Sequence, residues 1–103
     1  MGKPSRDKGG REERMLVHLF QDAGFAAERI PLSGAAHGSF AGDLTIPVLG
    51  QDWRFESKVR ANGFVQIYDW LGVHEGLFIR SDRNPPLVVL RVSDFIDVMK
   101  GRG

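Results

Sequence analysis

Apolar and polar residues follow two different periods along the first half of this chain. Between residues 10 and 23 the apolar side chains recur every three or four positions, which predicts an amphipathic helix that ends at Gly24. Residues 40–48 and 53–59 alternate between apolar and polar positions, which predicts two strands that each have one apolar face. A shorter strand is expected over residues 25–32, so this half predicts a helix followed by three strands.

The second half of the chain predicts a helix, two strands and a last helix. The helix covers residues 63–72 with Asn62 as its cap, the strands cover residues 76–81 and 87–92, and the last helix covers residues 94–100 with Ser93 as its cap. The Asn-Pro-Pro sequence between the two strands is a turn signal. No internal repeat and no second domain is apparent in this pattern.

Composition narrows the class of protein. The chain has 103 residues, of which 42% are hydrophobic and 26% charged, as expected for one globular domain with an ordinary core. The absence of cysteine excludes disulfides and thiolate zinc sites. No apolar stretch is long enough for a membrane span, and the N-terminus does not resemble a signal peptide. We therefore expect a cytoplasmic protein that does not associate with membranes.

Positive charge is concentrated at the N-terminus, although the net charge of the chain is only +1. The basic residues there are Lys3, Arg6, Lys8 and Arg11, against the single acid Asp7. Residues 1–9 are expected to form a flexible arm, and residues 10–103 one folded domain. The arm is either a solvated tail or a contact for phosphates, and the sequence leaves both open.

The predicted hairpin of the second and third strands carries acidic side chains on its polar face. A turn centred on residues 49–50 places Asp43 opposite Glu56, and a turn centred on residues 50–51 places it opposite Lys58. In both registers the three side chains lie on one face, with Cβ atoms roughly 5 to 8 Å apart. An exposed face with ordinary ion pairs is one explanation of this pattern.

A metal site is the other explanation. Two carboxylates at this separation repel one another unless a cation lies between them. Mg²⁺ prefers oxygen ligands, so we expect Asp43, Glu56 and the main-chain carbonyl of Ser57 to hold it. Lys58 would then position a water molecule or stabilise charge on phosphoryl oxygens. Such a site hydrolyses phosphodiester bonds.

These residues also resemble a known signature. Asp43, followed thirteen positions later by Glu56-x-Lys58, is similar to the motif of the PD-(D/E)xK nuclease superfamily, with Gly42 in place of its proline. Residues 8–34, "KGGREERMLVHLFQDAGFAAERIPLSG", resemble the start of archaeal-type Holliday-junction resolvases and their phage relatives. The resemblance implies a single α/β domain with a restriction-endonuclease-like αβββαβ core, in which helices flank a central mixed sheet.

The resemblance also implies roles for individual residues. The implied catalytic residues are Glu13, Asp43, Glu56 and Lys58, with Glu12 as the alternative to Glu13 on the first helix. The implied DNA-binding residues are Arg14, Arg29, Ser33 and Arg60. Gln66 on the second helix is a further candidate for positioning the nucleophile. The aromatic residues Trp53, Phe55, Tyr68 and Trp70 are expected in the core rather than on a surface that stacks bases.

The sequence thus favours a Mg²⁺-dependent DNA endonuclease, with Mn²⁺ as a substitute metal, that acts on branched or four-way DNA. A homodimer is expected because a junction requires two symmetric cuts, and the apolar residues of the second helix are its expected interface. Two alternatives remain open. The chain is a general, restriction or nicking nuclease of the same superfamily, or it is a DNA-binding relic without activity.

Overall fold

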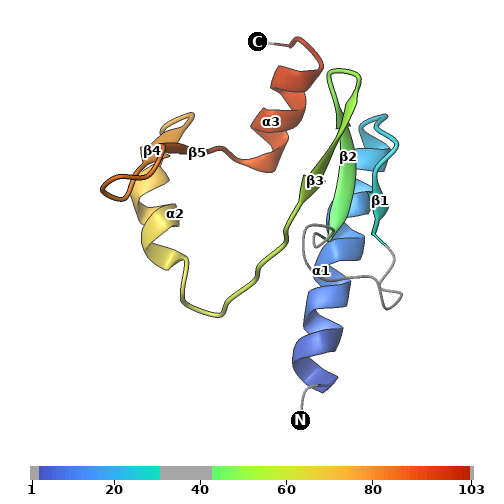
Figure 1. Cartoon of the computed structure of the whole chain (residues 1–103), viewed down its shortest axis with the longest axis horizontal. Helices are drawn as coiled ribbons and strands as arrows, with labels where there is room; N and C mark the ends of the chain where they lie inside the picture. The colour runs from blue at the N-terminus through green and yellow to red at the C-terminus, as the bar shows by residue number, and fades with distance from the viewer. Residues whose placement is uncertain (1–2, 31–42, 103) are drawn as a thin grey trace. The chain divides into compact units, whose positions relative to one another are not determined.

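A computed structural model of the chain describes residues 3–30 and 43–102. These residues gather into two compact units, one within residues 1–59 and the other within residues 60–103. Figure 1 shows the helices and strands of each unit in chain order. The elements are α1 (Lys3–Asp22), β1 (Glu28–Arg29), β2 (Leu44–Val48), β3 (Gln51–Phe55), α2 (Val65–Leu71), β4 (Leu77–Ile79), β5 (Leu87–Val89) and α3 (Val92–Met99). Their order is the predicted one.

Helix α1 begins earlier than its sequence predicts. It starts at Lys3, so that residues 3–9, expected to form a flexible arm, are helical. Gly9 and Gly10 lie within the helix, where each costs up to about 1 kcal/mol relative to alanine.

The C-terminal end of α1 was predicted correctly at Gly24. Gly24 has a φ of 100°, and its N–H donates to the carbonyl of Gln21. The N–H of Phe25 donates to the carbonyl of Phe20, and the two rings pack edge to face with centroids 6.3 Å apart. This combination is a Schellman motif with its hydrophobic contact, which closes the helix and turns the chain toward β1.

Strands β1, β2 and β3 form an antiparallel sheet in that order, and α1 contacts β1 and β2 (Figure 1). The side chains of Leu44, Ile46 and Val48 are buried, as their alternation predicted. Val17 and Phe20 of α1 are also buried and complete the centre of this core. The opposite face of β2 carries Thr45 and Pro47, which are half-buried.

The turn between β2 and β3 fixes their register. Leu49 and Gly50 both have positive φ angles, 50° and 87°, as a two-residue type I′ hairpin turn requires. Val48 consequently pairs with Gln51, and Leu44 with Phe55. Of the two registers open from sequence, this is the one centred on residues 49–50.

The second unit contains α2, the β4–β5 hairpin and α3. Leu77, Phe78 and Ile79 of β4 pair antiparallel with Val89, Val88 and Leu87 of β5. The predicted caps are wrong for both helices: α2 has Phe64 at its N-cap position and α3 has Arg91, neither with a capping side-chain hydrogen bond. The Arg91 guanidinium instead donates to the carbonyls of Gly72 and His74, which ties the end of α2 to the start of α3.

Two further expectations differ from the structure. The described strands form two sheets, both antiparallel, rather than one mixed sheet, because β4 finds its partner in the adjacent strand β5 through a short loop. Three of the aromatic side chains expected in the core are substantially exposed, namely Trp53, Tyr68 and Trp70.

Among the described residues, no helix is both long and apolar enough to cross a membrane.

Candidate functional site

Asp43 lies immediately before β2 and is held from both sides by the sheet. Its N–H donates to the carbonyl of Phe55 at 2.8 Å, and its carbonyl accepts from the N–H of Ile30 at 2.9 Å. Its carboxylate accepts a hydrogen bond from the main-chain N–H of Ser57, with 2.6 Å between Oδ2 and N. The half-buried carboxylate is therefore positioned by main-chain groups rather than by a flexible partner.

Glu56 lies at the open end of the hairpin, directly after the last paired residue of β3. The last pair of the ladder is Leu44 with Phe55, and the N–H of Asp43 donates to the carbonyl of Phe55, so Asp43 and Glu56 are the residues next to this pair on the two segments. Strand β3 ends at Phe55, and the next residues include Ser57, whose N–H holds Asp43. The hairpin thus brings the predicted carboxylates to one end of the sheet, and the register responsible is fixed by the turn.

Lys58 is paired with Glu56 in this structure. Lys58 Nζ lies 3.3 Å from Glu56 Oε2, and the two side chains are 58% and 53% exposed. Exposed ion pairs contribute only about 0 to 1 kcal/mol, because water screens the charges and ordering both side chains costs entropy. Either group can therefore leave the pair for a cation or a phosphate at small energetic cost.

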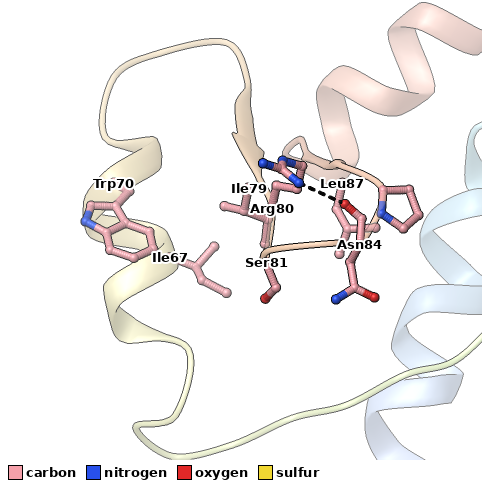
Figure 2. Close-up of a pocket in the computed structure, with 8 residues that line it drawn as sticks. Ile67, Trp70, Ile79, Arg80, Ser81, Asn84 and Leu87 are labelled. Carbon is pink, nitrogen blue, oxygen red and sulfur yellow. Dashed lines mark hydrogen bonds between the residues drawn. The ribbon is translucent and has the colours of Figure 1, made fainter.

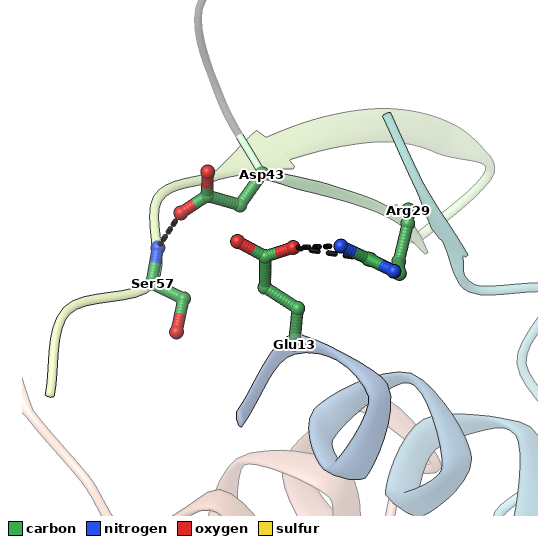
Figure 3. Close-up of polar contacts among 4 residues, drawn as sticks. All are labelled: Glu13, Arg29, Asp43 and Ser57. Carbon is green, nitrogen blue, oxygen red and sulfur yellow. Dashed lines mark hydrogen bonds and ion pairs between the residues drawn. The ribbon is translucent and has the colours of Figure 1, made fainter. Parts of the chain in front are cut away.

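Glu13 extends from α1 toward the same end of the sheet. Its Oε1 accepts two hydrogen bonds from the Arg29 guanidinium, from Nε at 3.0 Å and from Nη2 at 2.8 Å. Figure 3 shows that the other carboxylate oxygen of Glu13 points toward Asp43 and Ser57. The Glu13 side chain is only 18% exposed, so its orientation is constrained by packing as well as by Arg29.

Gly10 is a feature of this region that sequence analysis did not single out. A Cβ atom added to Gly10 would lie 3.3 Å from Nη1 of Arg14 and 3.8 Å from Nη2 of Arg29. Two guanidinium groups therefore approach the surface of α1 at a position without a side chain. No sequence signal shows this, because Arg29 reaches Gly10 only after the chain has turned back along α1.

The oxygen donors at the hairpin end fit a hard divalent cation. Within residues 3–30 and 43–102, no three His, Cys, Asp or Glu side chains are grouped closely enough to hold a metal ion. Mg²⁺ commonly uses only one or two protein carboxylates, with water and substrate phosphates as the remaining ligands. The donor set of Asp43, Glu56 and the Ser57 carbonyl meets that requirement, provided that Glu56 leaves Lys58.

The remaining candidates are not gathered at this site by the described contacts. Ser33 lies outside the described residues. Arg60 is exposed and begins the second unit, and Gln66 is exposed on α2. On α1 it is Glu13, and not its neighbour Glu12, that pairs with Arg29.

Comparison with known protein families gives a match that covers most of the chain. A model of the archaeal Holliday junction resolvase (hjc) family matches residues 4–84. The matched segment includes all the described residues of the site and continues through α2 and β4. The match confirms the resemblance and the restriction-endonuclease-like α/β fold class expected from sequence. No curated protein and no solved structure matches the chain significantly.

Proposed function

Because the chain belongs to the archaeal Holliday junction resolvase family, we propose that it is a Mg²⁺-dependent endonuclease that cuts DNA specifically at four-way junctions. Family membership itself implies a nuclease. The observation that supports the finer proposal is the hydrogen bond from the Ser57 N–H to the Asp43 carboxylate, which brings Asp43 to the segment that carries Glu56 and Lys58. Mn²⁺ is the expected substitute metal.

Asp43 and Glu56 hold the cation in this proposal, with the Ser57 carbonyl as a third oxygen donor. Bound there, Mg²⁺ would supply a Lewis acid that acidifies water and offsets charge on the phosphoryl oxygens. The hydrogen bond from the Ser57 N–H keeps the Asp43 carboxylate oriented before the substrate arrives. Such preorganisation matters because a loose carboxylate would have to be ordered during the reaction.

Lys58 acts on the reacting phosphate. Once Glu56 turns to the cation, the Lys58 ammonium can donate to the attacking water or to a non-bridging phosphoryl oxygen. The oxygen of that water forms a new bond to phosphorus, one bridging P–O bond breaks, and the departing oxygen takes up a proton. Glu13 lies beside this position, with its charge partly balanced by Arg29.

Arginines near α1 bind the DNA backbone in the proposal. Arg14 and Arg29 place guanidinium groups close to Gly10, where a phosphate can approach the helix surface. A guanidinium donates two parallel hydrogen bonds to a phosphate, which fixes its orientation as well as attracting it. Ser33 and Arg60 are further proposed contacts to the DNA.

The proposal is tested by cleavage of a labelled four-way junction beside a linear duplex of equal length, in Mg²⁺ and in EDTA. We expect paired symmetric cuts in the junction alone, which disappear in EDTA. Glu56→Gln and Lys58→Met should each reduce cleavage by at least about 100-fold, since each removes a charged group from the reacting centre. Asp52→Asn is the matched control, because Asp52 is an exposed acid on the same hairpin.

Other outcomes would point to the alternatives. Equal cutting of junction and duplex would indicate a general nuclease. Tight binding of DNA without any cleavage in Mg²⁺ or Mn²⁺ would indicate a relic and contradict the catalytic proposal. Loss of thermal stability in Glu56→Gln would show that Glu56 has a structural role instead.

We also propose that the active form is a homodimer, since two strands of a junction are cut symmetrically. On α2, Leu71 is buried within its own unit, whereas Tyr68 and Val65 are 74% and 50% exposed. Tyr68→Asp should therefore shift the sedimentation coefficient from dimer to monomer. Val98→Asp, at an exposed apolar position of α3, is the control. A wild-type chain that sediments as a monomer at all concentrations would contradict the dimer.

A further inference from the structure

A pocket of about 720 Å³ opens between α2 and the β4–β5 hairpin (Figure 2). Its apolar wall includes Ile67, Trp70 and Leu87, and its polar side chains are Arg80, Ser81 and Asn84. Pockets of this size commonly accommodate small organic groups, with a few polar side chains that fix orientation. All these residues belong to the second unit, and none is part of the Asp43 site.

Trp70 supplies an aromatic face at this pocket. Its side chain is 56% exposed, although an aromatic residue on an amphipathic helix was expected in the core. Across the part of the chain that the structure describes, no other aromatic ring packs against the indole. An indole that is half exposed and has no ring contact within the described residues can stack on a flat ligand without displacing a neighbour.

Arg80 supplies positive charge beside that aromatic face. Its guanidinium makes one long hydrogen bond, from Nη1 to the carbonyl of Asn84 at 3.5 Å. Within the described residues it forms no salt bridge with a carboxylate, in contrast to Arg29, Arg91 and Arg102. Its charge is therefore available to an anion, and the anion that a nuclease encounters is a DNA phosphate.

Ser81 and Asn84 add groups that suit the edge of a base. The Asn84 amide donates from Nδ2 to the carbonyl of Asp82 at 3.2 Å, which fixes its direction and leaves Oδ1 as an acceptor. The Ser81 hydroxyl both donates and accepts. An aromatic face, a guanidinium without a carboxylate partner among the described residues and short polar side chains are the combination by which proteins bind single nucleotides of a strand.

We propose that this pocket binds one unpaired nucleotide of the DNA substrate, with its base on Trp70 and its phosphate at Arg80. The inference rests on the proposed action on branched DNA. A base within a duplex is covered on both faces by its neighbours, whereas an unpaired base costs little to unstack. The pocket would then favour DNA with an open branch point over an uninterrupted duplex.

Fluorescence of Trp70 tests the contact directly. The chain contains two tryptophans, so Trp53→Phe leaves Trp70 as the sole indole. Titration of this variant with a short oligothymidylate in EDTA should quench the emission saturably, and added salt should reverse the effect. The reciprocal variant, Trp70→Phe, reports on Trp53 and should respond much less.

Binding of the labelled oligonucleotide, followed by anisotropy in EDTA, identifies the contributing groups. Trp70→Leu should weaken binding about tenfold through lost stacking, while Val73→Ala, at a 93% exposed position outside the pocket, should not change it. Arg80→Ala should lower the slope of log K against log salt by about 0.7, as expected for one lost phosphate contact on a single strand. Arg83→Ala is its control, because Arg83 lies in the same loop but does not line the pocket.

The outcomes separate this inference from the proposed function. A chain that cuts junctions but shows no Trp70 quenching overturns the pocket proposal alone. Quenching without metal-dependent cleavage supports the pocket and contradicts the nuclease proposal. If Trp70→Leu and Arg80→Ala both retain wild-type affinity and melting temperature, or if Trp70→Leu changes only the oligomeric state, the pocket does not bind nucleotides and the proposal is wrong.

Discussion

At the scale of the single residue, Asp43 combines a structural contact with a proposed chemical one. One carboxylate oxygen accepts the Ser57 N–H, while the residue as a whole is tied into the sheet through its own main chain. A carboxylate that is already hydrogen-bonded loses little freedom when it binds a cation. The same arrangement means that substitution of Asp43 affects both stability and activity, in proportions that depend on the replacement.

Asparagine and alanine at position 43 should separate the two roles. In Asp43→Asn the amide oxygen can still accept from the Ser57 N–H, so we expect less than about 1 kcal/mol of destabilisation. In Asp43→Ala that half-buried donor loses its partner, which should cost about 1 to 2 kcal/mol. Both should abolish cleavage, because neither provides the charge. Denaturant unfolding and the junction assay together check this, and equal stability of the two variants would contradict the structural role.

At the scale of the element, the β2–β3 hairpin determines which acids meet. Its two-residue turn sets the register, whose last pair is Leu44 with Phe55, so Asp43 and Glu56 lie next to the last paired residues at the open end. Leu49 occupies the first turn position with a φ of 50° and a side chain that is 83% exposed. A non-glycine residue in this conformation is strained and gains little from burial, so the turn is held by the strand pairing on either side.

Substitutions in the turn should therefore change stability in opposite directions. Leu49→Asn should stabilise the chain by about 0.5 to 1 kcal/mol, because asparagine tolerates the left-handed conformation. Gly50→Ala should destabilise it by about 1 kcal/mol through backbone strain alone, since a Cβ added there meets no atom within 4 Å. Thermal unfolding of both variants is the measurement. A stabilised Gly50→Ala would show that the turn differs from the one described.

At the scale of the whole molecule, the two units differ in how much core they contain. The first unit buries Val17, Phe20, Ala27, Leu44, Ile46 and Val48, whereas the second buries Leu71 and Ile96. The second unit also exposes apolar side chains on α2 and on the β4–β5 hairpin, including Phe78 at 81%. Local stability follows buried apolar contacts, so it should be unevenly distributed along the chain.

Amide hydrogen exchange should reveal this difference. We expect the amides of β2 to exchange most slowly, because the strand is paired on both sides and covered by buried side chains. Amides of β4 and β5 should exchange faster, and their protection should rise with protein concentration if the second unit is covered in a homodimer. Slower exchange in β4 than in β2 at low concentration would contradict the assignment of the core.

Sequence alone was enough to predict the order of the elements, the buried face of β2 and the end of α1. These features depend on local periodicity and on glycine, which act over a few residues and need no partner. The sequence also contains the spacing of Asp43, Glu56 and Lys58, on which the resemblance to the nuclease superfamily rests. The match over residues 4–84 confirmed the family.

Three features became known only from the folded chain, namely the hairpin register, the pairing of Glu13 with Arg29 and the exposure of Trp70. Two registers were equally compatible with the alternating pattern, and the positive φ angles at Leu49 and Gly50 selected one of them. Glu13 and Arg29 are sixteen residues apart, so no local pattern links them. An amphipathic helix shows which residues are apolar but not which of them find a partner, because burial depends on what packs against each side.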